Sequence, residues 1–263
     1  MTACEAYIKS ANAQKRLPEL EPIIIQDAHY AYRYAKEIIQ GRWLEAEPII
    51  IKNAQWSYYY ALNVIKGLWP EAEETIIRNS FYACFYASEV MQRRWYEAEP
   101  AIIKDVQSAY RYAHKIIKGR WLEAEPIIMQ AAQYAYWYAL EVFQGRWYEA
   151  EENIINDSEV AHLYAKNIIQ GRWYEAESRM ISMPSVSFMY AREIIKGRWP
   201  EAEKRISMSE YKQSYVEAFF DEPVITKDQV GPFIWEHKKQ VGYFAPASLF
   251  ENKTSLLDIM VEE

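Results

Sequence analysis

The chain has 263 residues, of which 51% are hydrophobic and 16% are aromatic, and its formal net charge is −7. The apolar share is ample for a large buried core. The acidic balance argues against a generic nucleic-acid binder, because affinity for phosphates comes mainly from Lys and Arg. No window approaches about 18 uninterrupted apolar residues, and the first residues lack the basic and apolar pattern of a signal peptide. We therefore expect a cytoplasmic protein without a membrane span.

A 26-residue repeat runs through most of the chain without an insertion. Its signature is a Gly-Arg-Trp phrase followed closely by Glu-Ala-Glu, and a degenerate first copy has Leu17 in the tryptophan register. The tryptophans of the later copies are Trp43, Trp69, Trp95, Trp121, Trp147, Trp173 and Trp199. Self-similarity with a period between about 20 and 50 residues is typical of a solenoid or another repeat array.

The first half of each copy predicts an amphipathic helix of about 12–14 residues. In residues 53–66, small side chains stand at Ser57 and Ala61 and apolar ones at Val64 and Ile65, which places them on one helix face. The residue before that alanine is always tyrosine. These tyrosines are Tyr34, Tyr60, Tyr86, Tyr112, Tyr138, Tyr164 and Tyr190. We expect each ring to be buried between copies and each hydroxyl to satisfy a neighbouring backbone group.

The glycine of the phrase predicts the end of this helix. Gly67 stands just past the apolar face, after Lys66, so we expect it to be a left-handed C-terminal cap. Arg93 takes the place of this glycine in one copy, which predicts a strain of about 1 kcal/mol if the left-handed conformation is kept.

The second half of each copy predicts a helix of about 8 residues. Pro70 and two acidic residues suit its beginning. Another proline follows the acidic pair at Pro48, Pro100 and Pro126, so in those copies we expect the helix to be short, kinked or late to begin. The tryptophan should act as a wedge between helices, and the arginine should stack on it or pair with a glutamate of the adjacent copy.

Together these elements predict an all-α solenoid of about seven to eight helix–turn–helix repeats. Residues 1–208 form the array, because stacking of the copies buries a continuous core. Residues 209–263 form a non-repeat segment that either caps the last copy or binds a partner. Within it, residues 211–220 look helical, and residues 254–263 resemble a short amphipathic helix with an acidic end.

Recurring residues serve stacking, so specificity should lie at the positions that vary. Two positions of the long helix, three residues apart, vary most and share one helix face. They hold Tyr, Trp, Phe and Arg, residues that are enriched at protein–protein hot spots. We call this set the stripe: Tyr30, Arg33, Trp56, Tyr59, Tyr82, Phe85, Arg111, Tyr134 and Trp137. Either row of the stripe could instead be core against the next copy.

Catalytic and cofactor sites are not expected. Two glutamates at i and i+2 do not share a helix face. The four histidines fall in different registers without ligand spacing, and Cys4 and Cys84 fit neither a metal site nor a disulfide. A reduced thiol at Cys84 in turn indicates a reducing compartment. We find no phosphate loop or nucleophile elbow, and so expect no catalytic residue, metal or cofactor.

The phrase Tyr-Ala-x-x-Ile-Ile-Lys-Gly-Arg-Trp-Pro-Glu-Ala-Glu at residues 190–203 resembles tandem helical repeats of tailed bacteriophages and bacteria. The resemblance covers residues 8–207 and implies no activity. It implies a phage-encoded protein in the host cytoplasm that inhibits or modulates a host or defence protein. Two alternatives remain open at this point: a binder of single-stranded nucleic acid, and a self-assembling structural or virion component that polymerises through its end copies.

Overall fold

The computed structural model describes residues 1–220, and within them every regular element is helical. The predicted all-α solenoid is confirmed, since neighbouring helices pack in the same pattern from copy to copy. The predictions made for residues 221–263, including the helix at residues 254–263 and a capping or binding role, lie outside the described residues.

Each long element after the first is an α-helix that ends in one π-helical turn. The chain opens with α1 (Ala3–Ala13). The composite elements are α3 (Ala28–Tyr34) with η2 (Ala35–Ile39), α5 (Ala54–Tyr60) with η3 (Ala61–Ile65), α7 (Ser80–Phe85) with η4 (Tyr86–Met91), α9 (Val106–Tyr112) with η5 (Ala113–Ile117), α11 (Ala132–Tyr138) with η6 (Ala139–Phe143), α13 (Ser158–Tyr164) with η7 (Ala165–Ile169) and α15 (Pro184–Tyr190) with η8 (Ala191–Ile195). Asp or Asn side chains cap several starts; Asn53, for example, accepts from the backbone N–H of Trp56.

The short helices vary in length as their prolines predict. A four-residue helix forms where a proline follows the acidic pair, in α2 (Glu21–Ile24), α4 (Glu47–Ile50), α8 (Glu99–Ile102) and α10 (Glu125–Ile128). The helix has seven or eight residues without that proline, in α6 (Pro70–Ile77), α12 (Tyr148–Ile154), α14 (Tyr174–Met180) and α16 (Pro200–Ser207). A 3-10 turn, η1 (Pro18–Leu20), precedes α2, and α17 (Lys212–Phe219) is the last described helix.

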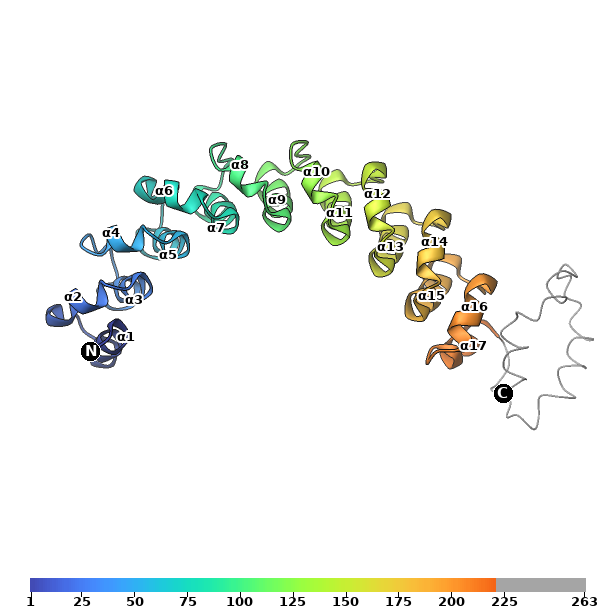
Figure 1. The fold of residues 1–263 in the computed structure, drawn as a ribbon, viewed down its shortest axis with the longest axis horizontal. Coiled ribbons are helices and arrows are strands. Elements are labelled where there is room, and N and C mark those ends of the chain that lie inside the picture. The colour runs from blue at the N-terminus through green and yellow to red at the C-terminus, as the bar shows by residue number, and fades with distance from the viewer. Residues whose placement is uncertain (221–263) are drawn as a thin grey trace, which may run out of the picture. The chain divides into compact units, whose positions relative to one another are not determined.

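The chain divides into two units, one of residues 1–134 with 141–143 and one of residues 135–140 with 144 onward. Within each unit the long elements form one layer and the short helices the other (Figure 1). In the first unit α5 packs against α3 and α7 in its own layer and against α4 and α6 in the other. Each long helix therefore presents one side to the short helices and leaves another side for its variable residues.

The glycine cap predicted from the sequence is wrong. The left-handed residue is the Lys or Gln before the glycine, as at Lys66 with φ 57°, and no described glycine has a positive φ. The last turn is π-helical, so the N–H groups of both Lys66 and Gly67 reach the carbonyl of Ala61, and the reversal falls one residue early. Arg93 is therefore not strained, because Gln92 takes the left-handed conformation in that copy.

Candidate functional site: the stripe on the long helices

The recurring residues form a network inside the array. The hydroxyl of Tyr60 accepts a hydrogen bond from the backbone N–H of Trp43 at 2.7 Å and donates one to Glu47 at 3.0 Å. The same tyrosine-to-backbone bond recurs at Tyr34, Tyr86, Tyr112, Tyr164, Tyr190 and Tyr215. The predicted role of the tyrosine hydroxyl is thus confirmed, and Tyr215 of α17 continues the pattern past residue 208. Burial raises the pKa of Tyr86 to about 12, so the phenol stays protonated as a donor.

The arginine of the phrase binds a different partner from those predicted. Arg42 neither stacks on the tryptophan nor reaches the adjacent copy; its Nε and Nη2 atoms each lie 2.8 Å from an oxygen of Glu47, five residues later. The guanidinium also stacks on an aromatic ring where one stands two residues on, as with Arg94 over Tyr96 at 4.6 Å. The turn between each long helix and the short helix that follows it, which we call the elbow, therefore joins arginine, glutamate, tyrosine and backbone in one structural unit.

A second set of bonds links each long helix to the next. Tyr58 donates to Glu89 at 2.7 Å, and the amide of Asn63 donates to Tyr32 at 3.0 Å. In the second unit His162 takes the tyrosine position and lies 3.1 Å from Glu193. Cys84, also in this position, is a free, buried thiol that contacts the Ser108 carbonyl at 3.5 Å. These residues are used for stacking, which leaves the stripe as the candidate for binding.

The structure brings the stripe of the first unit together as a continuous series of rings. Trp56 lies 6.0 Å from Tyr59, and Tyr59 lies 6.4 Å from Tyr82, measured between ring centroids. The series ends where the guanidinium of Arg111 lies 3.9 Å from the centre of the Phe85 ring. Rings that touch across neighbouring helices form one surface rather than separate patches.

Three residues that sequence reasoning missed belong to the same surface. His29 stacks on Trp56 at 4.4 Å and lies 4.8 Å from Tyr30, while Phe81 lies 4.4 Å from Phe85. Tyr7 of α1 contacts Tyr30 at 5.7 Å. His29 and Phe81 stand one residue before the first variable position of their helices. This adjacency to the stripe was the sequence signal that could have predicted their place on the surface. Tyr7 stands 26 residues before Arg33, at the second variable position of the degenerate first copy, so the repeat register was the available signal there.

Solvent reaches the stripe only in part, and its charges are largely balanced. Tyr30, Trp56, Tyr59, Tyr82 and Phe85 are all half-buried. Two ion pairs flank the rings: Arg33 with Glu37 at 3.0 Å, and Arg111 with Glu89 at 3.3 Å. The rings thus rest on the neighbouring helix and keep one edge open, an arrangement suited to contact with a partner at low entropic cost.

The remaining stripe residues lie at the end of this series or beyond it. Tyr134 is half-buried and contacts Tyr110 at 5.9 Å in the first unit. Trp137 belongs to the second unit and is 36% exposed. Later copies place Val160 and Val186 at the first variable position, and both are buried. The aromatic surface is therefore a property of the first unit, in line with the aliphatic trend of the sequence.

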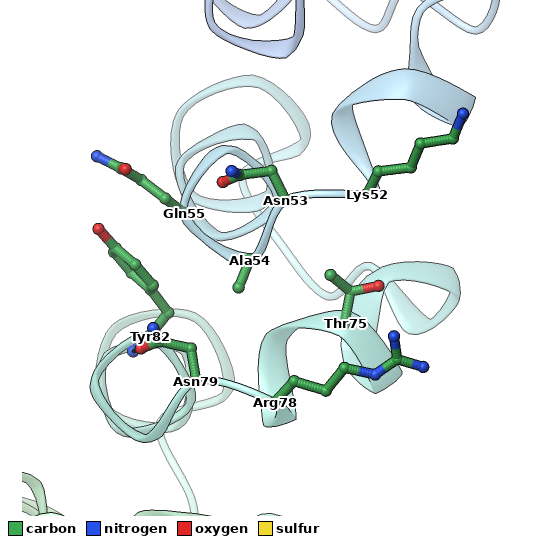
Figure 2. Close-up of a pocket in the computed structure, with 8 residues that line it drawn as sticks. All are labelled: Lys52, Asn53, Ala54, Gln55, Thr75, Arg78, Asn79 and Tyr82. Atoms are coloured by element: carbon green, nitrogen blue, oxygen red, sulfur yellow. Dashed lines mark hydrogen bonds between the residues drawn. The ribbon is translucent and has the colours of Figure 1, made fainter.

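A groove lies beside the stripe between the starts of α5 and α7. It has a volume of about 380 Å³ and is lined by Lys52, Asn53, Ala54, Gln55, Thr75, Arg78, Asn79 and Tyr82. Figure 2 shows the side chains of Lys52 and Arg78 at one side of the groove and those of Gln55 and Tyr82 at the other. Lys52 and Arg78 are the charged residues among these, and Tyr82 connects the groove to the rings.

Residues 1–220 contain no group of three or more His, Cys, Asp or Glu side chains that could hold a metal ion. No helix in that range has the length and hydropathy needed to cross a bilayer. Of the histidines in that range, His114 lies 3.0 Å from Glu141 and His162 is buried.

Comparisons with protein-family models, curated proteins and solved structures gave no match to this chain.

Proposed function

We propose that this chain is a non-enzymatic scaffold that binds a protein partner through the stripe. The observation that carries the proposal is the unbroken series of rings from Tyr30 to Phe85, which His29 and Phe81 join and Arg111 closes. Tyr, Trp and Arg are the residues whose truncation most often weakens protein–protein binding. Their rings are held by neighbouring helices, so little side-chain entropy is lost on association.

The resemblance of the repeat phrase to proteins of tailed bacteriophages and bacteria extends this proposal. On that basis the partner is a host or defence protein in a bacterial cytoplasm, which the scaffold inhibits or modulates. The charge of the chain favours a protein partner over a nucleic-acid partner, because the net charge is −7 and the arginines of the stripe are paired with glutamates.

Partner capture from a bacterial lysate tests the proposal with three forms of the full chain. One form is unchanged, one carries Tyr30→Ala, Trp56→Ala, Tyr82→Ala and Tyr134→Ala, and one carries Leu44→Ala, Tyr96→Ala and Leu122→Ala. The last three residues, each 64–65% exposed, stand in the turns between the tryptophans and the short helices and serve as a matched control. We expect a specific protein to be retained by the unchanged and control forms and lost from the stripe variant.

Capture that survives in the stripe variant would place the interface elsewhere. Capture that disappears after nuclease treatment would favour the nucleic-acid alternative. A mass from light scattering that grows with concentration, and persists in the stripe variant, would favour self-assembly instead.

A further inference from the structure

The helices that border the groove, α5 and α7, have uncharged caps, whereas the next long helices on either side have acidic caps. Asn53 and Asn79 cap the helices that border it, whereas Asp27 and Asp105 cap the helices on either side. Amide caps perform the same hydrogen bonding as carboxylate caps but add no negative charge. The cations at the groove therefore face no acidic residue among those that line it.

A row of cations follows the edge of the stripe. Lys52, Arg78 and Lys104 each stand directly before a helix cap, one in each successive copy, and all three are exposed. Arg78 pairs with Glu74 at 2.6 Å, but both side chains are largely in water, so the pair is weak and a carboxylate of a ligand can take the place of Glu74. In the described part of the chain Lys52 and Lys104 make no ion pair.

We propose that this groove binds carboxylates of an extended acidic segment of the protein partner, whose apolar side chains lie on Trp56, Tyr59 and Tyr82. The proposal rests on the proposed function and names the partner's chemistry. Helices packed side by side lie about 8–10 Å apart, and an extended chain advances about 3.3 Å per residue. Every third residue of such a segment can therefore meet the next copy.

A single-stranded nucleic acid fits the same surface less well. It carries a phosphate at every nucleotide, and its affinity depends on many cations. The arginines of the stripe, Arg33 and Arg111, are already paired with Glu37 and Glu89. A polyanion would meet those carboxylates, whereas a peptide can place its acidic residues on one edge only.

The test measures the binding of labelled twelve-residue peptides to the full chain by fluorescence anisotropy. The probe is (Asp-Leu-Pro)4, its uncharged counterpart is (Asn-Leu-Pro)4, and twelve-residue oligothymidylate represents nucleic acid. The key variant is Asn53→Asp with Asn79→Asp, which keeps both helix caps and adds two negative charges at the groove. Asn156→Asp, at an exposed position of the second unit, is the control.

We expect the acidic probe to bind more tightly than the amide probe, and the double variant to weaken it by about tenfold. The control should bind as the unchanged chain does, and circular dichroism should show the same fold in all forms. The proposal is overturned if the acidic probe does not bind, if both peptides bind equally, if the double variant has no effect, or if oligothymidylate binds more tightly. Equal binding of both peptides that is lost with Trp56→Ala and Tyr82→Ala would overturn this proposal alone, because the stripe would still be a peptide-binding surface.

Discussion

The hydroxyl of Tyr60 accepts the backbone N–H of Trp43, 17 residues earlier, at 2.7 Å. This bond ties the beginning of one short helix to the next long helix, and Glu47 completes it by accepting from the same hydroxyl. Tyr60 is fully buried, so water cannot replace a lost partner. The stacking of copies thus depends on polar groups as well as on the alanine and isoleucine faces.

Removal of the Tyr60 hydroxyl should lower the stability of the fold. Tyr60→Phe leaves the Trp43 N–H without a partner, so we expect the free energy of unfolding to fall by about 1–3 kcal/mol. Tyr59→Phe is the control, because Tyr59 is half-buried and its hydroxyl makes no hydrogen bond in residues 1–220; the effect should stay within about 0.5 kcal/mol. Urea denaturation followed by circular dichroism measures both. Equal effects of the two variants would show that the hydroxyl has no special role.

One copy lacks the arginine of the elbow, and a substitution at Leu68 can introduce it. Leu68 stands where the other copies carry arginine, and Glu73 there binds Tyr86 at 3.2 Å. Leu68→Arg should add a bidentate pair with Glu73 and raise the unfolding free energy by about 0.2–1 kcal/mol, a modest gain because the site is half in water. Leu68→Gln is the polar control without charge. A Leu68→Arg protein no more stable than Leu68→Gln would contradict the prediction.

The end of the long helix offers a paired test of backbone conformation. Lys66 has φ 57°, so Lys66→Gly should relieve roughly 1 kcal/mol of strain. Gly67 does not have a positive φ, and a Cβ there would meet nothing within 4 Å. Gly67→Ala should therefore stabilise the fold by about 0.4–1 kcal/mol, because it restricts the unfolded chain. If thermal unfolding shows that Gly67→Ala is destabilising and Lys66→Gly is not stabilising, glycine is the cap after all.

His162 should make the second unit sensitive to mild acid. Burial lowers the pKa of His162, although Glu193 opposes this; Lys166 and Arg192, near Glu193, act in the same direction as burial. A lowered pKa in the folded state means that stability is complete above the usual value of 6.5 and is lost as the pH falls through the folded value. His162→Tyr restores the residue of most other copies and should reduce this loss. The check is to measure the unfolding temperature of both proteins from neutral pH to about pH 5. An equal fall of that temperature in both proteins would show that His162 does not cause the acid sensitivity.

The helices and their packing faces follow from local pattern and period. A repeat of fixed length without insertions can bury its apolar residues only by stacking, so Ala61, Ile76 and the tryptophans were predictable as core. The shortened helices beside Pro48, Pro100 and Pro126 were predictable too, because proline removes a helical hydrogen bond wherever it stands. The role of the Tyr60 hydroxyl followed from the need of a buried phenol for a partner.

Other features depend on distances that no local pattern contains. The sequence does not say which glutamate of Glu-Ala-Glu faces Arg42, or that a π-helical turn moves the left-handed residue from Gly67 to Lys66. Whether Trp56 and Tyr82 would be core or surface was equally open, because both outcomes suit an aromatic residue on a helix. By itself, then, the sequence determined the repeat, its helices and the faces they bury, since these depend on spacing along the chain. The tertiary structure alone decided that the variable rings meet in one half-exposed stripe beside a basic groove, since that depends on how residues of neighbouring copies approach in space.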